Sequence, residues 1–134
     1  MDRKTELLAR VPLFAQLDQR SLEAVATLAR EVSAPAGTIL VREGDPAETF
    51  YVIVTGTVHV ERDGATVRSM SEGGFLGEIA LVEHGERTAT ASCATDCRLL
   101  ALGRFEFERV TATFPEIRAR IDAAVARRPH AAQE

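Results

Sequence analysis

The chain has 134 residues, of which 46% are hydrophobic and 27% charged, so its size and composition are those of one globular domain and not of a disordered chain. Its formal net charge is -4 and its 16 basic residues are scattered, which argues against direct binding to nucleic acid because such binding needs a positive face. No apolar run approaches the roughly 18 residues of a transmembrane helix, and the N-terminus lacks the apolar middle of a signal peptide, so we expect a cytoplasmic protein.

The first part of the chain has the apolar spacing of a helix. Within 17–32, apolar residues recur at intervals of three and four: Leu22, Val25, Leu28 and Val32. Asp18 comes just before this pattern and is a suitable N-cap, because its carboxylate can accept the unpaired N–H groups of the first turn. A shorter helical piece is expected before Pro12, which has no backbone donor. We therefore predict helices up to about residue 32.

After this region the pattern changes to short runs rich in β-branched residues, separated by Gly, Asp and Pro. The predicted strands are 38–41, 50–54, 57–62, 66–70, 88–94 and 97–102. Asp63-Gly64 is a strong signal for a tight hairpin, because both positions tolerate positive φ. Strands this short and evenly spaced predict an antiparallel β-barrel or jelly roll instead of a parallel sheet with helical crossovers.

The chain becomes helical again from residue 104. One helix is expected up to Phe114 and a second from Pro115, a residue that suits the first turn of a helix. The residues expected to supply apolar faces or to pack on the barrel are Phe105, Phe107, Val110, Phe114, Ile117, Ile121 and Val125. The predicted fold class is therefore α+β, mainly β: a single domain over 1–134, helical over 1–32, a jelly-roll barrel over 33–103 and helical again over 104–128.

Catalysis and metal binding find little support in the sequence. Cys93 and Cys97 are separated by three residues and have no second cysteine pair, which matches neither a disulfide framework nor a zinc signature. The three histidines, His59, His84 and His130, are dispersed and form no His-x-His pair. We therefore expect no catalytic residue, no metal and no cofactor.

One stretch, GGFLGEIALVEHGERTATA at 73–91, combines glycines with Glu78 and Arg87, nine residues apart. These two side chains suit a cyclic phosphate diester attached to a ribose that has a free hydroxyl. The guanidinium of Arg87 matches phosphate oxygens, whereas the ionised carboxylate of Glu78 accepts a hydrogen bond from the hydroxyl. Gly73, Gly74 and Gly77 would let the backbone approach such a ligand without a Cβ in the way.

Two further features of this stretch fit an anion. A short helical turn over 78–82 would point its first N–H groups at the anion, and the hydroxyl of Thr88 could bond a phosphate oxygen or the base. The plainer alternative is a surface ion pair between Glu78 and Arg87, which would contribute about 0 to 1 kcal/mol. That alternative does not explain the glycines and small residues on both sides, so we prefer the binding interpretation.

Phe75-Leu76-Gly77-Glu78-Ile79-Ala80-Leu81, followed by Arg87-Thr88-Ala89, resembles the phosphate-binding cassette of the cyclic nucleotide-binding domain family. The resemblance extends over nearly all of the chain, including PAGTILVREGD at 35–45 and the flanking helices. It implies that Glu78 binds the ribose 2′-hydroxyl and that Arg87 binds the cyclic phosphate. The other ligand-binding residues that it implies are Leu76, Gly77, Ile79, Ala80 and Thr88. It also implies that Arg127 or Arg128 caps the base, and the spacing from Pro115 favours Arg128. Many members of the family have proline where this chain has Glu86.

The resemblance also implies a function. We expect the chain to bind a cyclic nucleotide, cAMP in preference to cGMP, as a regulatory module whose C-terminal helices move on binding. Its partner would then be a channel, a transporter or an enzyme domain in a longer protein. The alternative is the N-terminal sensor part of a catabolite activator-type transcription regulator, truncated before its DNA-binding domain. The oligomeric state and the residues that select the base are not predicted.

Overall fold

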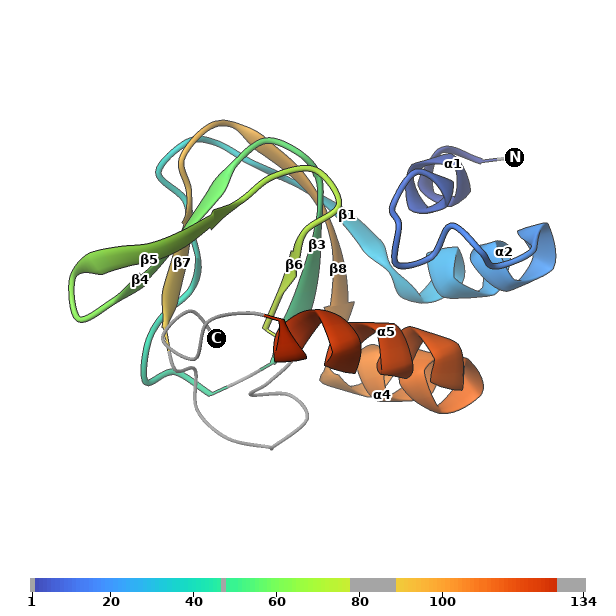
Figure 1. The fold of residues 1–134 in the computed structure, drawn as a ribbon. Helices are drawn as coiled ribbons and strands as arrows, with labels where there is room; N and C mark the ends of the chain where they lie inside the picture. Colours follow the sequence, from blue (N-terminus) through green and yellow to red (C-terminus); the bar gives the residue numbers. More distant parts are fainter. Residues whose placement is uncertain (1, 47, 78–88, 128–134) are drawn as a thin grey trace.

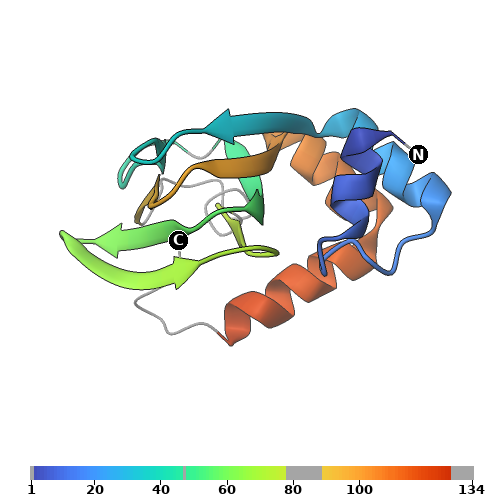
Figure 2. The same cartoon turned by 90° about the horizontal axis from the view of Figure 1, so that it is seen from above.

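The computed structural model describes residues 2–46, 48–77 and 89–127. Within this part of the chain, helices α1 (Arg3–Ala9) and α2 (Gln19–Leu28) precede the strands, and helices α4 (Arg104–Thr113) and α5 (Pro115–Ala126) follow them. The strands are β1 (Arg30–Ala34), β2 (Ile39–Val41), β3 (Thr49–Thr55), β4 (Val58–Arg62), β5 (Ala65–Met70), β6 (Phe75–Leu76), β7 (Thr90–Cys93) and β8 (Cys97–Gly103). In two perpendicular views the labelled helices gather at one side of the strands (Figures 1 and 2).

The described strands form two four-stranded sheets, in the orders β1-β8-β3-β6 and β2-β7-β4-β5. Every pairing between them is antiparallel. Strands far apart in the chain lie side by side, as β1 does with β8, so the chain passes repeatedly from one sheet to the other. The predicted fold class, a mainly β antiparallel barrel flanked by helices, is confirmed. None of the described helices is long and apolar enough to cross a membrane.

The sheet that contains β3 and β8 is buried on both faces. Successive side chains of a strand point to opposite faces, so Phe50 and Val52 of β3 pack with the helices whereas Ile53 lies in the barrel interior. In β8, Leu100 packs with the helices and Leu99 in the interior. This sheet therefore separates two apolar clusters, which we call the helix-side core and the barrel core.

The predicted helix through residue 32 is shorter than expected. α2 ends at Leu28, and β1 follows from Arg30 with a full antiparallel register against β8. Val32 fits the helical spacing, but the pairing of β1 with a strand about 70 residues away overrides that local preference. The ammonium of Lys4 donates to the carbonyl oxygen of Ala29 at 3.0 Å, just past the end of α2. β1 and the two-residue strand β6 were both missed by the sequence prediction.

The aromatic residues of α4 correct a second prediction. Phe105 is 78% exposed, whereas Phe107 is buried and its ring centroid lies 4.8 Å from that of Phe50. Two residues along a helix turn the side chain by about 200°, so only one of these two rings can face the barrel. Ile117 and Ile121 of α5 join the same helix-side core, as predicted.

Two local predictions are confirmed. Asp18 caps α2 by accepting a hydrogen bond from the backbone N–H of Ser21 at 2.8 Å, and this bond lowers the pKa of its carboxyl. Asp63 and Gly64 have φ angles of 53° and 80°, and they join β4 to β5 in a tight hairpin.

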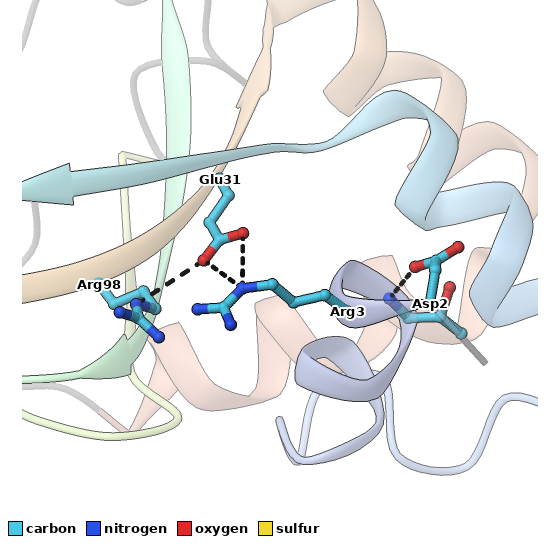
Figure 3. Close-up of polar contacts among 5 residues, drawn as sticks. Asp2, Arg3, Glu31 and Arg98 are labelled. Atoms are coloured by element: carbon cyan, nitrogen blue, oxygen red, sulfur yellow. Dashed lines mark hydrogen bonds and ion pairs between the residues drawn. The ribbon is translucent and has the colours of Figure 1, made fainter.

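A charged network on the surface joins α1 to the sheet (Figure 3). Nε of Arg3 lies 2.9 and 3.1 Å from the two carboxylate oxygens of Glu31 on β1. Nε of Arg98 on β8 lies 3.7 Å from one of these oxygens. Asp2 caps α1 by accepting from the N–H of Thr5, which lowers the pKa of Asp2. Because solvated ion pairs stabilise little, we interpret this network as orienting α1 on the sheet.

The two rings of α4 give a matched test of the helix-side core. Replacing the buried ring in Phe107→Ala should lower the free energy of unfolding by about 3 to 5 kcal/mol, because it leaves a cavity against Phe50. Phe105→Ala should change it by less than about 0.5 kcal/mol, since that ring is solvated. Urea unfolding of both variants measures the difference, and similar losses would contradict the packing described here.

Candidate functional site

The predicted ligand site lies partly outside the described residues. Glu78, Ile79, Ala80, Arg87, Thr88 and Arg128 belong to this undescribed set. Leu76 and Gly77, which precede them, and Ala89, which follows Thr88, are described. The structure therefore shows how the chain enters and leaves the stretch 78–88.

Both ends of that stretch are anchored in the barrel core. Leu76 of β6 is fully buried there and pairs with Tyr51 of β3. Ala89, one residue before β7, is also fully buried in the same cluster. Glu78 and Arg87 are each only two residues from one of these anchors in the sequence. The barrel core thus holds the chain just before and just after the predicted binding stretch.

Gly77 turns the chain directly after β6. Its φ is +96° and it is buried, in a conformation that residues with a Cβ rarely adopt. The backbone conformation itself therefore requires a glycine here, as it also does at Gly73, whose φ is +84°. Gly77 immediately precedes Glu78, so its conformation sets the direction in which the predicted binding stretch begins.

The other two glycines have a different role from the one predicted. A Cβ on Gly73 would lie 3.1 Å from Cδ of Pro12, and a Cβ on Gly74 would lie 3.1 Å from Cβ of Met70. Gly74 also closes a turn by donating its N–H to the carbonyl oxygen of Ser71 at 2.9 Å. Contacts within the protein account for both glycines, and the positive φ of Gly73 adds a second reason at that position.

The sequence did not indicate several half-buried side chains around the barrel core. Leu40, Tyr51 and Val67 pack against it from three different strands. Leu40 and Tyr51 also line a hollow of about 260 Å³ beside β2, whose polar lining includes Arg42. Such side chains offer apolar contacts for a flat ring, but their grouping depends on strand register, which the sequence pattern did not reveal.

The thiol of Cys93 is unreactive at neutral pH. Cys93 and Cys97 are both buried, and neither forms a disulfide. Burial, and then contact with Cys97, raises the pKa of the Cys93 thiol to about 12, so it stays protonated at neutral pH. Sγ of Cys97 lies 3.4 Å from the carbonyl oxygen of Thr95 as a hydrogen-bond donor. Over residues 2–46, 48–77 and 89–127, no group of three or more His, Cys, Asp or Glu side chains is placed to hold a metal ion.

An antiparallel β-barrel that holds Leu76 and Ala89 in its core, on either side of the predicted binding stretch, is typical of the class of ligand-binding β-barrel modules. The model of the cyclic nucleotide-binding domain matches residues 31–114. The chain therefore belongs to the cyclic nucleotide-binding domain family. The resemblance expected from the cassette motif is thereby confirmed.

Individual relatives agree with this assignment. A cAMP-dependent protein kinase regulatory subunit of Candida albicans is 41% identical over 98 residues, which is 73% of this chain and 21% of that protein. A cyclic nucleotide-gated potassium channel of Mesorhizobium japonicum is 34% identical over 115 residues, 86% of this chain and 32% of that protein. The crystal structure of the Thermus thermophilus catabolite activator protein is similar with a TM-score of 0.77 and 27% identity, covering 87% of this chain and 57% of that one. The chain thus spans about a fifth to a third of the two curated relatives.

A pair of glycine variants separates backbone strain from a role at the site. Gly77 and Gly37 have φ angles of +96° and +92°, so alanine at either position should lower the free energy of unfolding by about 1 to 2 kcal/mol. A Cβ on Gly37 meets nothing within 4 Å, which makes Gly37→Ala a clean control for strain. Only Gly77→Ala should also weaken cAMP binding, by about tenfold or more, because it redirects the backbone just before Glu78.

Thermal unfolding and calorimetric titration of the two variants provide the two readouts. Equal affinity for cAMP in Gly77→Ala and Gly37→Ala would show that the turn after β6 has no part in binding.

Proposed function

We propose that this domain binds a cyclic nucleotide, cAMP in preference to cGMP, and serves as a regulatory module. One observation carries the proposal. The pairs Gly77-Glu78 and Arg87-Thr88 lie in the sequence between Leu76 and Ala89, and these two residues are fully buried in the barrel. The preference for cAMP is supported by the 41% identity to a regulatory subunit of a cAMP-dependent kinase.

The chemistry of the proposed site divides the ligand between two side chains. Arg87 provides a planar, permanently charged fork for the cyclic phosphate. Glu78 provides acceptors for the ribose 2′-hydroxyl and would repel a phosphate placed directly against it. The backbone N–H groups of Ile79 and Ala80 would add donors to the phosphate, with Thr88 beside it and Leu76 and Gly77 lining the entry. We propose binding without turnover, so no residue is assigned a catalytic role.

The charge pair gives the sharpest test of the site. Arg87→Ala should weaken cAMP binding by about 2 to 5 kcal/mol, roughly 30-fold to several thousandfold, because the phosphate loses its paired cation. Glu78→Ala should cost less, since it removes acceptors for a single hydroxyl. Arg109→Ala, which removes an exposed arginine of α4, is the matched control and should bind like the parent protein.

Calorimetric titrations with cAMP and cGMP, run side by side on the three variants and the parent protein, measure these effects. Unchanged cAMP affinity in Arg87→Ala would rule out the proposed site, and tighter cGMP than cAMP binding would reverse the proposed preference.

We further propose that binding shifts the positions of α4 and α5. α4 packs on the barrel through Phe107, which contacts Phe50 in the strand next to β6. α5 contributes Ile117 and Ile121 to the same helix-side core. Both helices therefore lie on the face of the sheet opposite to the barrel core in which the binding stretch is anchored. A ligand shifts such an equilibrium only by its difference in affinity for the two arrangements, which a base contact from Arg128 would supply.

The movement is testable without a partner protein. Addition of saturating cAMP should change the amide NMR signals of residues 104–127 well beyond the changes in α1, because α4 and α5 change their contacts and α1 does not. Arg87→Ala at the same nucleotide concentration is the control and should leave these signals in place. Unmoved helix signals at full saturation of the parent protein would contradict the proposed movement.

A second candidate is the sensor part of a catabolite activator-type transcription regulator. The observation in its favour is the structural similarity to the Thermus thermophilus catabolite activator protein over 87% of this chain. The mass of the natural gene product separates the two candidates, since a product with a DNA-binding domain after the helices would favour the regulator.

In either case we propose a cytosolic location, supported by two cysteines that form no disulfide.

A further inference from the structure

A hollow of about 340 Å³ lies between α5, the segment around Leu13 and the start of β6. Its apolar lining includes Leu13, Phe75, Ala123 and Ala124. Leu13 and Phe75 are only 5% and 7% exposed and form the deep part, whereas Ala123 is exposed at the edge. Small-molecule pockets typically measure about 300 to 1,000 Å³ and are mostly apolar with a few polar groups, so this hollow falls at the small end of that range.

Two arginines of α5 supply the charge of this hollow. Arg120 and Arg127 both line it, and no carboxylate is among the described residues that do. They are seven residues apart, which is two helical turns or about 10 Å along the axis, so they lie on the same face of α5 with Ala123 and Ala124 between them. The hollow thus combines an apolar floor with a positive wall, in a chain whose net charge is -4.

Two uncharged oxygen atoms hold the guanidinium of Arg120 in place, whereas Arg127 is fixed only through its backbone. Nη1 of Arg120 donates to the carbonyl oxygen of Leu13 at 3.4 Å and to Oε1 of Gln16. The backbone N–H of Arg127 bonds to the carbonyl oxygen of Ala124 at 3.2 Å, which fixes the residue at the last turn of α5. A carbonyl and an amide oxygen are uncharged, so the positive charge remains available to an anion. The fixed donor of Arg120 also lowers the entropy lost when a ligand binds.

We propose that this hollow binds a small amphipathic anion, a medium-chain carboxylate, with its alkyl chain on Leu13 and Phe75 and its carboxylate on Arg120 and Arg127. An apolar ligand alone would leave the two charges unused, and a purely polar anion would leave the apolar floor exposed to water. A guanidinium fork matches the two oxygens of a carboxylate. The site shares no residue with the cyclic nucleotide site, so it does not depend on that proposal.

A chain-length series tests the apolar part of the site. Butanoate, hexanoate and octanoate are titrated into the full chain without nucleotide, and the amide NMR signals of Leu13, Ala123 and Ala124 are followed. Each added methylene should tighten binding about two- to fourfold as it leaves water. Octanol, which has the same chain without the charge, should bind about tenfold more weakly than octanoate. No shift of these signals with octanoate, or equal binding of octanol, would overturn the proposal.

Variants of α5 test the location. Arg120→Gln and Arg127→Gln should each weaken octanoate binding by about tenfold, and Ala123→Phe, at an exposed position, should fill the hollow and prevent binding. Arg118→Gln is the matched control, because Arg118 lies on the same helix but pairs with Asp122 at 3.1 Å and does not line the hollow. Equal loss of binding in Arg118→Gln, or full binding in Ala123→Phe, would show that octanoate binds elsewhere and would overturn the proposal.

Discussion

The structure depends on the burial of one sheet, β1-β8-β3-β6, on both of its faces. Ile53 and Leu99 point into the barrel core, while Phe50 and Leu100 point into the helix-side core. A shift of one residue in strand pairing would exchange these two sets, which differ in size and shape, so the register is strongly specified. The same register places β6, and therefore Gly77, relative to α4 and α5.

The barrel core also holds the two residues between which the predicted binding stretch runs in the sequence. The stretch 78–88 connects Gly77 to Ala89, and its neighbours Leu76 and Ala89 are both fully buried. Long loops without such anchors lose much entropy when they order around a ligand. The barrel core holds both anchors in place before any ligand arrives. The barrel therefore fixes the positions at which the predicted binding stretch begins and ends.

What the sequence predicted well was local chemistry. Asp18 as a cap and Asp63-Gly64 as a hairpin depend only on neighbouring residues, and both were found where expected. What it missed depends on distant partners. Val32 fits a helical spacing equally well, and only its pairing with Leu99 on β8 makes it part of a strand. The choice between Phe105 and Phe107 likewise depends on which face of α4 meets Phe50.

The candidate site shows the same division. The motif around Glu78 and Arg87 was readable because residue type and spacing carry its chemistry, and the family assignment agrees with it. The grouping of half-buried side chains around the barrel core could not be predicted from the sequence, because Leu40, Tyr51 and Val67 come together only through strand pairing. The contact between Gly73 and Pro12 was not predictable for the same reason, since the two residues lie far apart in the sequence.

The packing of α5 limits how the proposed movement can occur. Ile117 and Ile121 are each 1% exposed, and burial of such a side chain stabilises by about 1.5 to 3 kcal/mol. Releasing both would cost about 3 to 6 kcal/mol, in addition to the roughly 5.5 kcal/mol of differential affinity needed to move an equilibrium from 1:99 to 99:1. A nucleotide would have to supply both amounts if α5 left the core. A pivot that keeps Ile117 and Ile121 buried while the end near Arg127 moves avoids the first cost, so we favour that form of movement.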